Sequence, residues 1–143
     1  MVNSLNAACE QGFVPDQLYV IENPGVEDQV SRALELATTI ITAYDGDEPE
    51  IHLTTLETEV AFDRILSHVR DAIDEIHAEG GEVAVDITPG RKFMSAIAFA
   101  AGMRYDADHV YYFYLRSTEF FGHLYPDMPR TASHLYDFTE ELA

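Results

Sequence analysis

The chain has 143 residues, 47% of them hydrophobic, which is enough to bury the core of one ordinary domain without disulfides. Its 26 acidic residues against 8 basic ones give a formal net charge of −18, and Lys92 is the only lysine. Because affinity for a nucleic-acid backbone requires clustered basic side chains, this balance argues against general DNA or RNA binding.

The remaining composition indicates where the protein works. Cys9 is the only cysteine, so no internal disulfide can form, and residues 1–4 lack the basic and apolar run of a signal peptide. The longest apolar stretches are far shorter than the ~20 residues of a membrane-spanning helix. We therefore expect a cytoplasmic protein that does not enter a membrane. The acidity itself is typical of a halophilic cytoplasm, where salt screens repulsion between carboxylates.

Helical and strand-like patterns alternate along the chain. Apolar residues at three- and four-residue steps predict helices, and short apolar runs between turn residues predict strands. The predicted helices are residues 5–10, 27–44, 62–76 and 91–103. The predicted strands are residues 17–21, 51–56, 83–87 and 108–115. This alternation is typical of right-handed crossovers, so we expect an α/β fold, a Rossmann-like three-layer sandwich with a mainly parallel sheet.

Residues 116–143 show no clear period. Their prolines and aromatic residues predict an extended segment ahead of a short final helix. Such a segment either packs back on its own sheet or contacts a second copy of the chain. We therefore divide the chain into a domain at 1–115 and a C-terminal aromatic segment at 116–143, with both packing alternatives open.

The segment after the third predicted strand is the candidate anion site. In open α/β sheets, ligands bind beyond the carboxyl ends of the strands, where a following helix offers free N–H groups. Gly90 allows close approach of the backbone, Thr88 has a hydroxyl, and Arg91 and Lys92 place two cations at a helix start, where positive charge is unfavourable. A bound anion would compensate for that placement. The alternative is that Lys92 pairs with an acid such as Asp86 or points to solvent.

Several familiar sites are missing from the sequence. A Walker loop needs Gly-x-x-x-x-Gly-Lys-Ser/Thr, but Phe93 follows Lys92, and no Gly-x-Gly-x-x-Gly is present. The six histidines do not pair at metal-ligand spacing, so we predict no metal and no cofactor. Asp86 and Lys92 could serve a restriction-type nuclease, but Gly90 stands where the glutamate of the Glu-x-Lys pair belongs.

Residues 86–95, Asp-Ile-Thr-Pro-Gly-Arg-Lys-Phe-Met-Ser, resemble a motif of the CARF (CRISPR-associated Rossmann fold) family. Members typically have Thr-x-Gly-Arg/Thr-Lys-x-Met after a core strand, then a helix and a hydrophobic strand like the one here at 108–111. Pro89 stands where many members have a second glycine. The likeness extends more loosely, in the order of helices and strands, over residues 3–115.

This resemblance implies a homodimer that binds a small cyclic nucleotide, a cyclic oligoadenylate second messenger of antiviral defence, across its two-fold axis. The ligand-binding residues that it implies are Thr88, Pro89, Gly90, Arg91, Lys92, Met94 and Ser95. Some members also cleave the ring slowly without a metal, by attack of a ribose 2′-hydroxyl on the adjacent phosphate, and Lys92 would then be the catalytic residue. A ligand-free scaffold or interaction protein of the same fold is the alternative.

The chain departs from the family pattern at its start. Members begin with a strand and a Gly/Ser/Thr-bearing loop that forms the opposite wall of the pocket, whereas this sequence starts inside the first helix. We therefore expect an incomplete pocket within residues 1–143, either because residues precede Met1 in the cell or because binding has been lost. We also expect no ribonuclease or DNA-binding module in a chain of this length.

Overall fold

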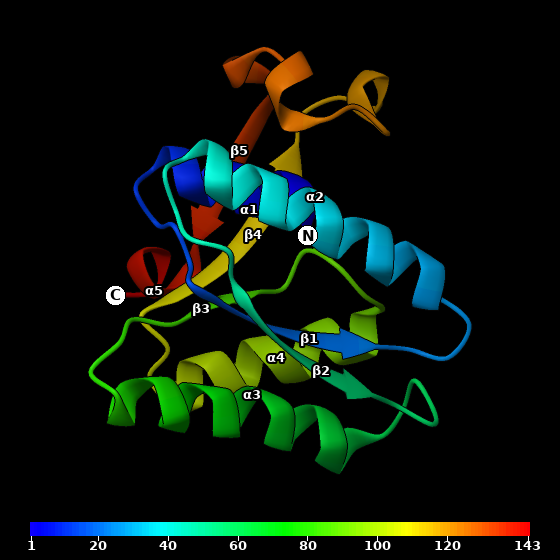
Figure 1. Ribbon diagram of the computed structural model, residues 1–143, viewed down its shortest axis with the longest axis vertical. Coiled ribbons are helices and arrows are strands. Elements are labelled where there is room, and N and C mark those ends of the chain that lie inside the picture. Colours follow the sequence, from blue (N-terminus) through cyan, green and yellow to red (C-terminus); the bar gives the residue numbers. More distant parts are fainter.

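The computed structural model describes residues 1–143 and has three layers (Figure 1). Helices α1 (Val2–Glu10) and α2 (Glu27–Ala43) lie on one side of the strands, and α3 (Phe62–Ala78) and α4 (Lys92–Arg104) lie on the other. The predicted α/β class is confirmed. None of the helices is both long enough and apolar enough to cross a membrane.

Five strands lie between the helix layers, in two groups. β1 (Gln17–Glu22) pairs in parallel with β2 (Glu50–Thr55). β3 (Ala84–Asp86) pairs in parallel with β4 (His109–Leu115), and β4 pairs antiparallel with β5 (Ser133–Asp137). The sheet orders are therefore β2-β1 and β3-β4-β5, with no ladder between β1 and β3. The strands are mainly parallel, as predicted, but they do not form one continuous sheet.

The third predicted strand is matched by hydrogen bonding beyond the three residues of β3. The Val83 carbonyl accepts hydrogen bonds from the N–H groups of Asp108 and His109. At the other end, the Ile87 N–H donates to the Tyr111 carbonyl at 2.9 Å. Pairing with β4 thus runs over the whole predicted range, 83–87.

The C-terminal residues add a strand that the sequence patterns did not predict. Short 3-10 helices follow β4 at Thr118–Phe120, Tyr125–Asp127 and Arg130–Ala132. β5 then lies along β4, and α5 (Phe138–Glu141) follows it. Tyr125, Met128 and Leu135 are buried in one apolar cluster with residues of α1 and β4. Within a single chain, this segment packs back on its own sheet.

Apolar clusters cover both faces of β4. Tyr111 and Phe113 pack toward α1, whereas Val110 is fully buried in the cluster formed with α3 and α4. Gly102 allows the close packing of α4, because a Cβ at this position would lie 2.9 Å from Cγ2 of Val110. This packing fixes α4, and with it the loop that precedes α4.

Candidate functional site

The connection from β3 together with the first turn of α4, residues 87–94, is called the loop below and lies at the carboxyl edge of the strands. The chain passes from β1 to β2 in one sheet and from β3 to β4 in the other, and the two sheets share no ladder. Open α/β sheets bind ligands beyond the carboxyl ends of their strands. Met94 and Ile21, at the end of β1, both pack on the cluster that contains Leu56, which follows β2. The loop therefore lies close to the ends of β1 and β2.

Five consecutive backbone N–H groups in this loop, those of residues 90–94, have no acceptor within the chain. The hydrogen bonds of α4 begin only with the Ser95 N–H, which donates to the Arg91 carbonyl at 3.0 Å. Gly90 has a φ of 89°, a conformation that glycine adopts readily and that turns the backbone from β3 toward the start of α4. Free donors arranged in this way at a helix N-terminus form an anion-binding site.

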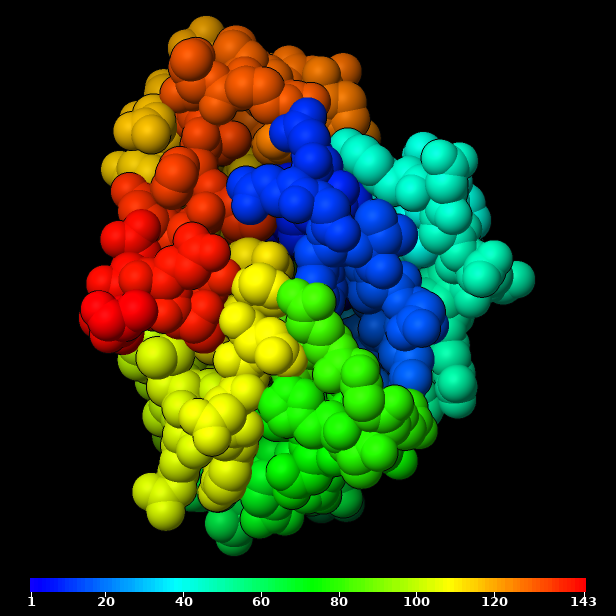
Figure 2. Space-filling model, turned by 90° about the vertical axis from the view of Figure 1, so that its left-hand side faces the viewer, coloured from blue at the N-terminus to red at the C-terminus, as the bar shows by residue number.

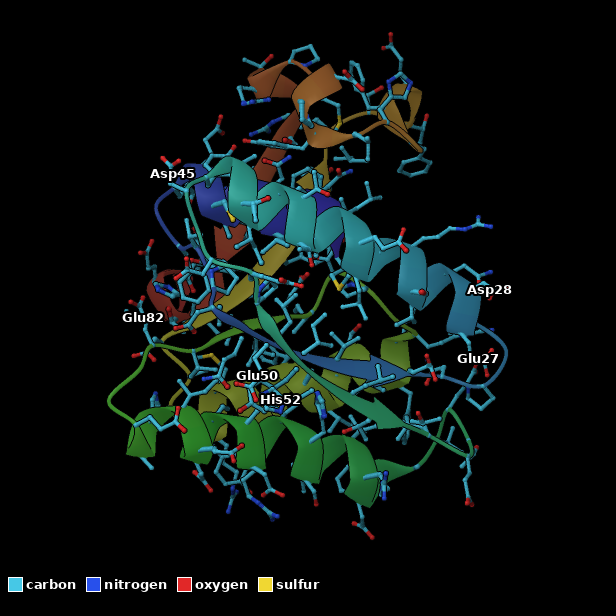
Figure 3. All side chains as sticks on the ribbon, viewed as in Figure 1. Glu27, Asp28, Asp45, Glu50, His52 and Glu82 are labelled. Carbon is cyan, nitrogen blue, oxygen red and sulfur yellow. The ribbon has the colours of Figure 1, made fainter.

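Acidic side chains distinguish α4 from the other two long helices. Glu27 and Asp28 lie in the first turn of α2, and Asp63 lies in the first turn of α3. Figure 3 shows Glu27 and Asp28 at the start of α2. The first turn of α4 has no acidic residue and contains Lys92. A carboxylate at a helix start stabilises the positive end of the helix dipole. Of these three helices, only α4 lacks such a carboxylate, so its start would gain this stabilisation from a bound anion.

Lys92 is exposed and takes part in no ion pair or hydrogen bond. Asp86, the acid considered as its partner, accepts hydrogen bonds instead from the Ser4 hydroxyl and, at 2.9 Å, from the Thr88 N–H. Arg91 Nε lies 3.4 Å from Glu59 Oε2, but both side chains are exposed, so this pair is weak. An unpaired cation therefore stands beside the free N–H groups.

Most of the predicted ligand-binding residues have partners inside the protein. The Thr88 hydroxyl oxygen accepts a hydrogen bond from the Phe113 N–H at 2.8 Å, and the Ser95 hydroxyl donates to the Pro89 carbonyl at 3.3 Å. The Met94 side chain packs against the core. These contacts hold the loop in shape. The donors of the predicted set that have no partner are the N–H groups, the Lys92 ammonium and the Thr88 O–H, and Arg91 is held only by its weak pair with Glu59.

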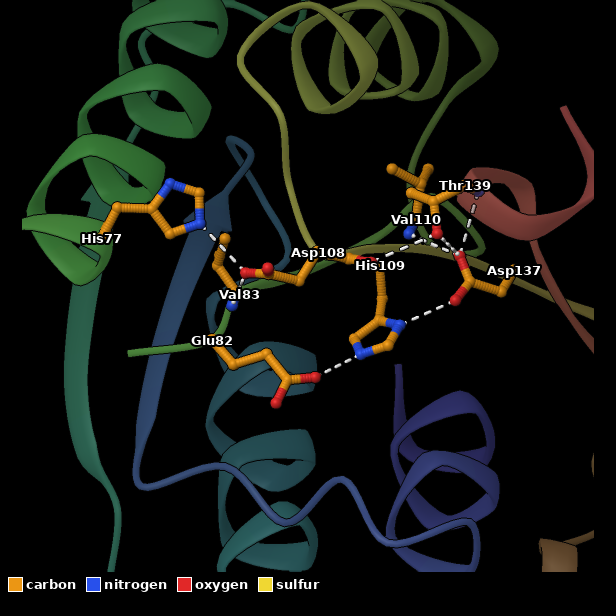
Figure 4. Close-up of polar contacts among 8 residues, drawn as sticks. All are labelled: His77, Glu82, Val83, Asp108, His109, Val110, Asp137 and Thr139. Atoms are coloured by element: carbon orange, nitrogen blue, oxygen red, sulfur yellow. Dashed lines mark hydrogen bonds and ion pairs between the residues drawn. The ribbon is translucent and has the colours of Figure 1, made fainter. Parts of the chain in front are cut away.

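A second polar region lies at the opposite, amino edge of the strands, and Figure 4 shows it in close-up. His109 Nδ1 lies 2.7 Å from Asp137 Oδ2, and His109 Nε2 contacts the Glu82 carboxylate. Burial alone would lower the pKa of His109, but the hydrogen bonds with Asp137 and Glu82 outweigh it and raise this pKa. With both ring nitrogens engaged, the imidazole has none free for base catalysis or metal binding.

A pocket of about 510 Å³ opens beside this histidine. Its lining includes the carboxylates of Glu82, Asp137, Glu140 and Glu141. Figure 2 looks onto this face, where the C-terminal residues (red) meet the start of β4 (yellow) and the segment before β3 (green). Four carboxylates repel phosphate, and no group of three or more His, Cys, Asp or Glu side chains is arranged to hold a metal ion. The carboxyl-edge loop is therefore the better candidate for an anionic ligand.

Comparison with known families agrees with part of the expected resemblance. The family described as CRISPR-associated protein NE0113 (Cas_NE0113) matches residues 5–140. The chain belongs to this family. A search of curated proteins found no match. In this CRISPR-associated protein, the matched residues include both the loop at 87–94 and β5, so the segment after β4 lies within the region of similarity.

Sequence reasoning located the loop of this CRISPR-associated protein but missed how it is held. Asp86 accepts a hydrogen bond from the backbone two residues ahead, an Asx turn whose signal, an aspartate at a strand end, was available in the sequence. The bond from Ser4 to Asp86 joins residues 82 positions apart and has no local signal. At the end of β1, Asn23 has a buried Oδ1 without a hydrogen-bond partner.

Proposed function

We propose that this CRISPR-associated protein is a nucleotide-sensing module of CARF type, which binds a cyclic oligoadenylate as a homodimer. The observation that carries the proposal is the unpaired Lys92 beside five free N–H groups, at the carboxyl end of β3, in a chain of net charge −18. A protein that is otherwise so acidic repels phosphate. A cation without an acidic partner on such a surface therefore points to an anionic ligand. The family of CRISPR-associated proteins to which the chain belongs supports a role in CRISPR defence, the setting that this proposal assumes.

The loop matches the chemistry of a phosphodiester. The N–H groups of residues 90–94 donate to the non-bridging phosphate oxygens, and the Lys92 ammonium adds a charge-assisted contact. The bound phosphate also neutralises the positive end of α4, which has no acidic residue of its own. Contacts of this kind recognise the phosphodiester backbone of the ring and the repetition of its phosphates. The bases are recognised by other contacts.

A second copy of the chain completes the site in this proposal. The loop lies on the surface of one chain, and the large apolar side chain of Phe93 is 42% exposed directly beside Lys92. An exposed aromatic residue next to a binding loop is typical of a protein interface. Two loops related by a two-fold axis present the same donors twice, which suits a ring with repeated phosphates.

Ring cleavage is the catalytic extension of the same proposal. A bound ribose 2′-oxygen attacks the adjacent phosphorus, the bond from phosphorus to the 5′-oxygen breaks, and the proton of the 2′-hydroxyl ends on that leaving oxygen. The products are a 2′,3′-cyclic phosphate and a 5′-hydroxyl. Lys92 stabilises the charge that develops on the phosphate oxygens, and the step uses no metal.

Calorimetry with cyclic tetra-adenylate and cyclic hexa-adenylate at molar salt tests the binding. Lys92→Ala is expected to weaken binding by roughly 1–3 kcal/mol, the scale of one charge-assisted contact. Arg104→Ala is the matched control, because it removes the same charge from the other end of α4 and should leave affinity unchanged.

The remaining outcomes separate the alternatives. Unchanged affinity in Lys92→Ala would remove this residue from the site. Failure of the wild-type protein to bind either ring would favour the ligand-free scaffold. Sedimentation with and without ligand tests the homodimer, and mass spectrometry of the ring after incubation in EDTA tests metal-independent cleavage.

A further inference from the structure

β5 is an edge strand, and the hydrogen bonds of β4 show which of its residues face outward. β5 pairs only with β4, with Leu135 opposite Phe113 and Asp137 opposite Tyr111. The Phe113 N–H and the Tyr111 carbonyl are both bonded on the side of β4 that faces β3. Opposite residues of an antiparallel pair that do not bond to each other direct their backbone groups outward. Leu135 and Asp137 therefore direct theirs away from the sheet.

The outward groups of β5 have no partner in the chain. No hydrogen bond outside the ladder with β4 involves the N–H or carbonyl of Leu135, or the N–H of Asp137. Leu135 is also only 8% exposed, so its backbone groups have limited access to water. A strand bound along this edge would satisfy them, which is the usual way in which an unpaired sheet edge binds a peptide.

Two pockets adjoin β5 beside the end of α1. One of about 230 Å³ is lined by Ser133, His134 and Leu135 together with residues of α1. The pocket of about 510 Å³ beside His109 is lined by His134, Leu135 and Asp137. Since both pockets include the same two residues of β5, we call them together the β5 groove. Figure 2 shows the C-terminal residues, in orange and red, next to the N-terminal residues in blue.

The β5 groove is acidic where β5 meets α5. Glu140 and Glu141 line the larger pocket, are exposed, and pair with no basic side chain. Glu82 and Asp137 line it as well, with His109 between them. No lysine or arginine lines this pocket. Its charge is therefore complementary to an occupant with basic side chains.

The other face of the same edge is aromatic. Leu135 packs in the cluster that contains α1, so the alternate residues His134 and Tyr136 lie on the face away from α1. The ring centroids of these two residues are 4.4 Å apart, and Tyr114 of β4 lies 6.3 Å from Tyr136. Tyr114 is 43% exposed. A strand beside β5 would thus have acidic residues on one face and aromatic rings on the other.

We propose that the outer edge of β5 binds a strand of a partner protein in which Lys or Arg alternates with apolar residues. The backbone of this strand pairs with the outward groups of Leu135 and Asp137. Its basic side chains enter the β5 groove toward Glu140 and Glu141, and its apolar side chains cover the aromatic face. Binding at this edge involves neither the loop at 87–94 nor a nucleotide.

Charge favours this partner over a second copy of the chain. Pairing of two β5 strands would bring the carboxylates of one groove beside those of the other. Like charges held close together repel, and no basic side chain lines the larger pocket to offset this repulsion. A basic strand instead gains from the same carboxylates, and its binding should weaken as salt is added.

A peptide of about seven residues that alternates lysine with valine, with its ends acetylated and amidated, tests the edge. At saturating peptide, amide exchange of Leu135 and Asp137 should slow by about 10-fold or more, as measured by NMR. The matched control peptide has the same composition with its lysines in one block, so it has the same charge without the alternation. No change in exchange, or equal protection by both peptides, overturns the proposal.

Paired variants test the acidic wall. Glu140→Gln with Glu141→Gln should weaken binding of the alternating peptide by about 5- to 10-fold. Glu35→Gln with Glu57→Gln removes the same charge from residues that do not line the groove, and should weaken it by less than about 2-fold. Equal losses in the two variants would mean that net charge alone attracts the peptide, and would overturn the assignment to this edge.

Two further outcomes concern the occupant and the sensing function. Protection of Leu135 and Asp137 that rises with protein concentration in the absence of peptide overturns the proposal, because a second copy then fills the edge. Lys92→Ala should bind the peptide as the wild type does. Since no measurement here involves a nucleotide, failure at this edge is separate from failure of nucleotide sensing.

Discussion

Gly90 is the residue on which the shape of the loop depends. Its φ of 89° is unfavourable for any residue with a Cβ, and a Cβ here would also lie 3.1 Å from the Met94 Sδ. We predict that Gly90→Ala destabilises the protein by roughly 1–2 kcal/mol and weakens ligand binding as well, because the N–H groups turn away from the phosphate. Urea unfolding and calorimetry measure the two effects.

The control for this substitution is Gly122→Ala. Gly122 has a φ of 82° and no atom within 4 Å of a built Cβ, so it has the same backbone strain without a displaced neighbour. It should lose similar stability and keep full affinity. Wild-type affinity in Gly90→Ala would show that the loop backbone does not contact the ligand.

The sequence identified the free cation of the loop and the free N–H groups of the helix start, but not the contacts that hold the loop. Lys92 stands out as the only lysine of an acidic chain, and its position at a helix start breaks a dipole preference. Thr88 was expected to offer its hydroxyl to a ligand, and its oxygen also accepts a hydrogen bond from Phe113, 25 residues away, which leaves the O–H able to donate. Contacts between residues so far apart leave no local pattern in the sequence. Only the structure therefore shows which groups hold the loop and which remain free.

At the scale of elements, His109 connects the start of β4 to the segments on both sides. It contacts Glu82, which precedes β3, and Asp137, where β5 meets α5. Its raised pKa makes a contribution to stability that is complete below the ordinary value of 6.5 and is lost as pH rises through the raised value. Burial would raise the pKa of Asp137, but hydrogen bonds from His109 and Thr139 lower it, so this carboxylate stays charged in mildly acidic solution.

We therefore predict that His109→Gln lowers the unfolding temperature more at about pH 5.5 than at about pH 8.5. Thermal unfolding of the wild type and the variant across this range measures the difference between them, which cancels the titration of other groups. His123→Gln is the control, because His123 is exposed and contacts no carboxylate. An equal loss at both pH values would mean that the charged form of His109 adds nothing.

The helices and the parallel strands were readable from the sequence, whereas β5 was not. α2 and α3 have 17 residues each, so the three- and four-residue spacing of their apolar residues repeats several times. A single residue that breaks the pattern does not hide it. β5 has only five residues, follows three 3-10 turns and pairs antiparallel with a strand that precedes it by a long connection. A five-residue alternation among scattered aromatics is too short a signal to separate from a loop.

Met128 tests whether the C-terminal segment belongs to the core. Its side chain is 4% exposed and packs in the cluster that joins α1, β4 and β5. We predict that Met128→Ala lowers the free energy of unfolding by about 2–5 kcal/mol, because it leaves a cavity in that cluster. Leu142→Ala, at a side chain that is 62% exposed, should change stability by less than about 0.5 kcal/mol. A small effect of Met128→Ala would mean that the segment is an independent arm.

At the scale of the whole molecule, the predicted α/β class follows from the alternation of elements, but the break in the sheet does not. The pattern that predicts a strand at 17–21 or 83–87 reports burial and period, and it does not report which neighbour a strand pairs with. Pairing depends on segments far apart in sequence. The division of the strands into two sheets is therefore a property that only the assembled fold displays.

The charge of the molecule is mostly uncompensated within the fold. Among 26 acidic residues, only Glu10, Glu59 and Asp71 pair with an arginine. The other carboxylates repel one another across the surface, and this repulsion is screened as the Debye length falls from about 10 Å at 0.1 M salt to about 3 Å at 1 M. Folding brings these charges closer together, so salt should favour the folded state.

We predict that raising the KCl concentration from about 0.1 M to about 1 M increases the unfolding temperature by roughly 3–8 °C. The variant Asp47→Asn with Glu48→Gln, which removes two unpaired surface carboxylates, should be more stable at low salt and gain less from added salt. Phosphate binding at Lys92 should weaken over the same range, because ions compete for the cation. Added salt should thus raise the unfolding temperature measured by scanning calorimetry and lower the affinity measured by ligand titration. An unfolding temperature that does not depend on salt would show that repulsion between surface carboxylates does not limit the stability of this fold.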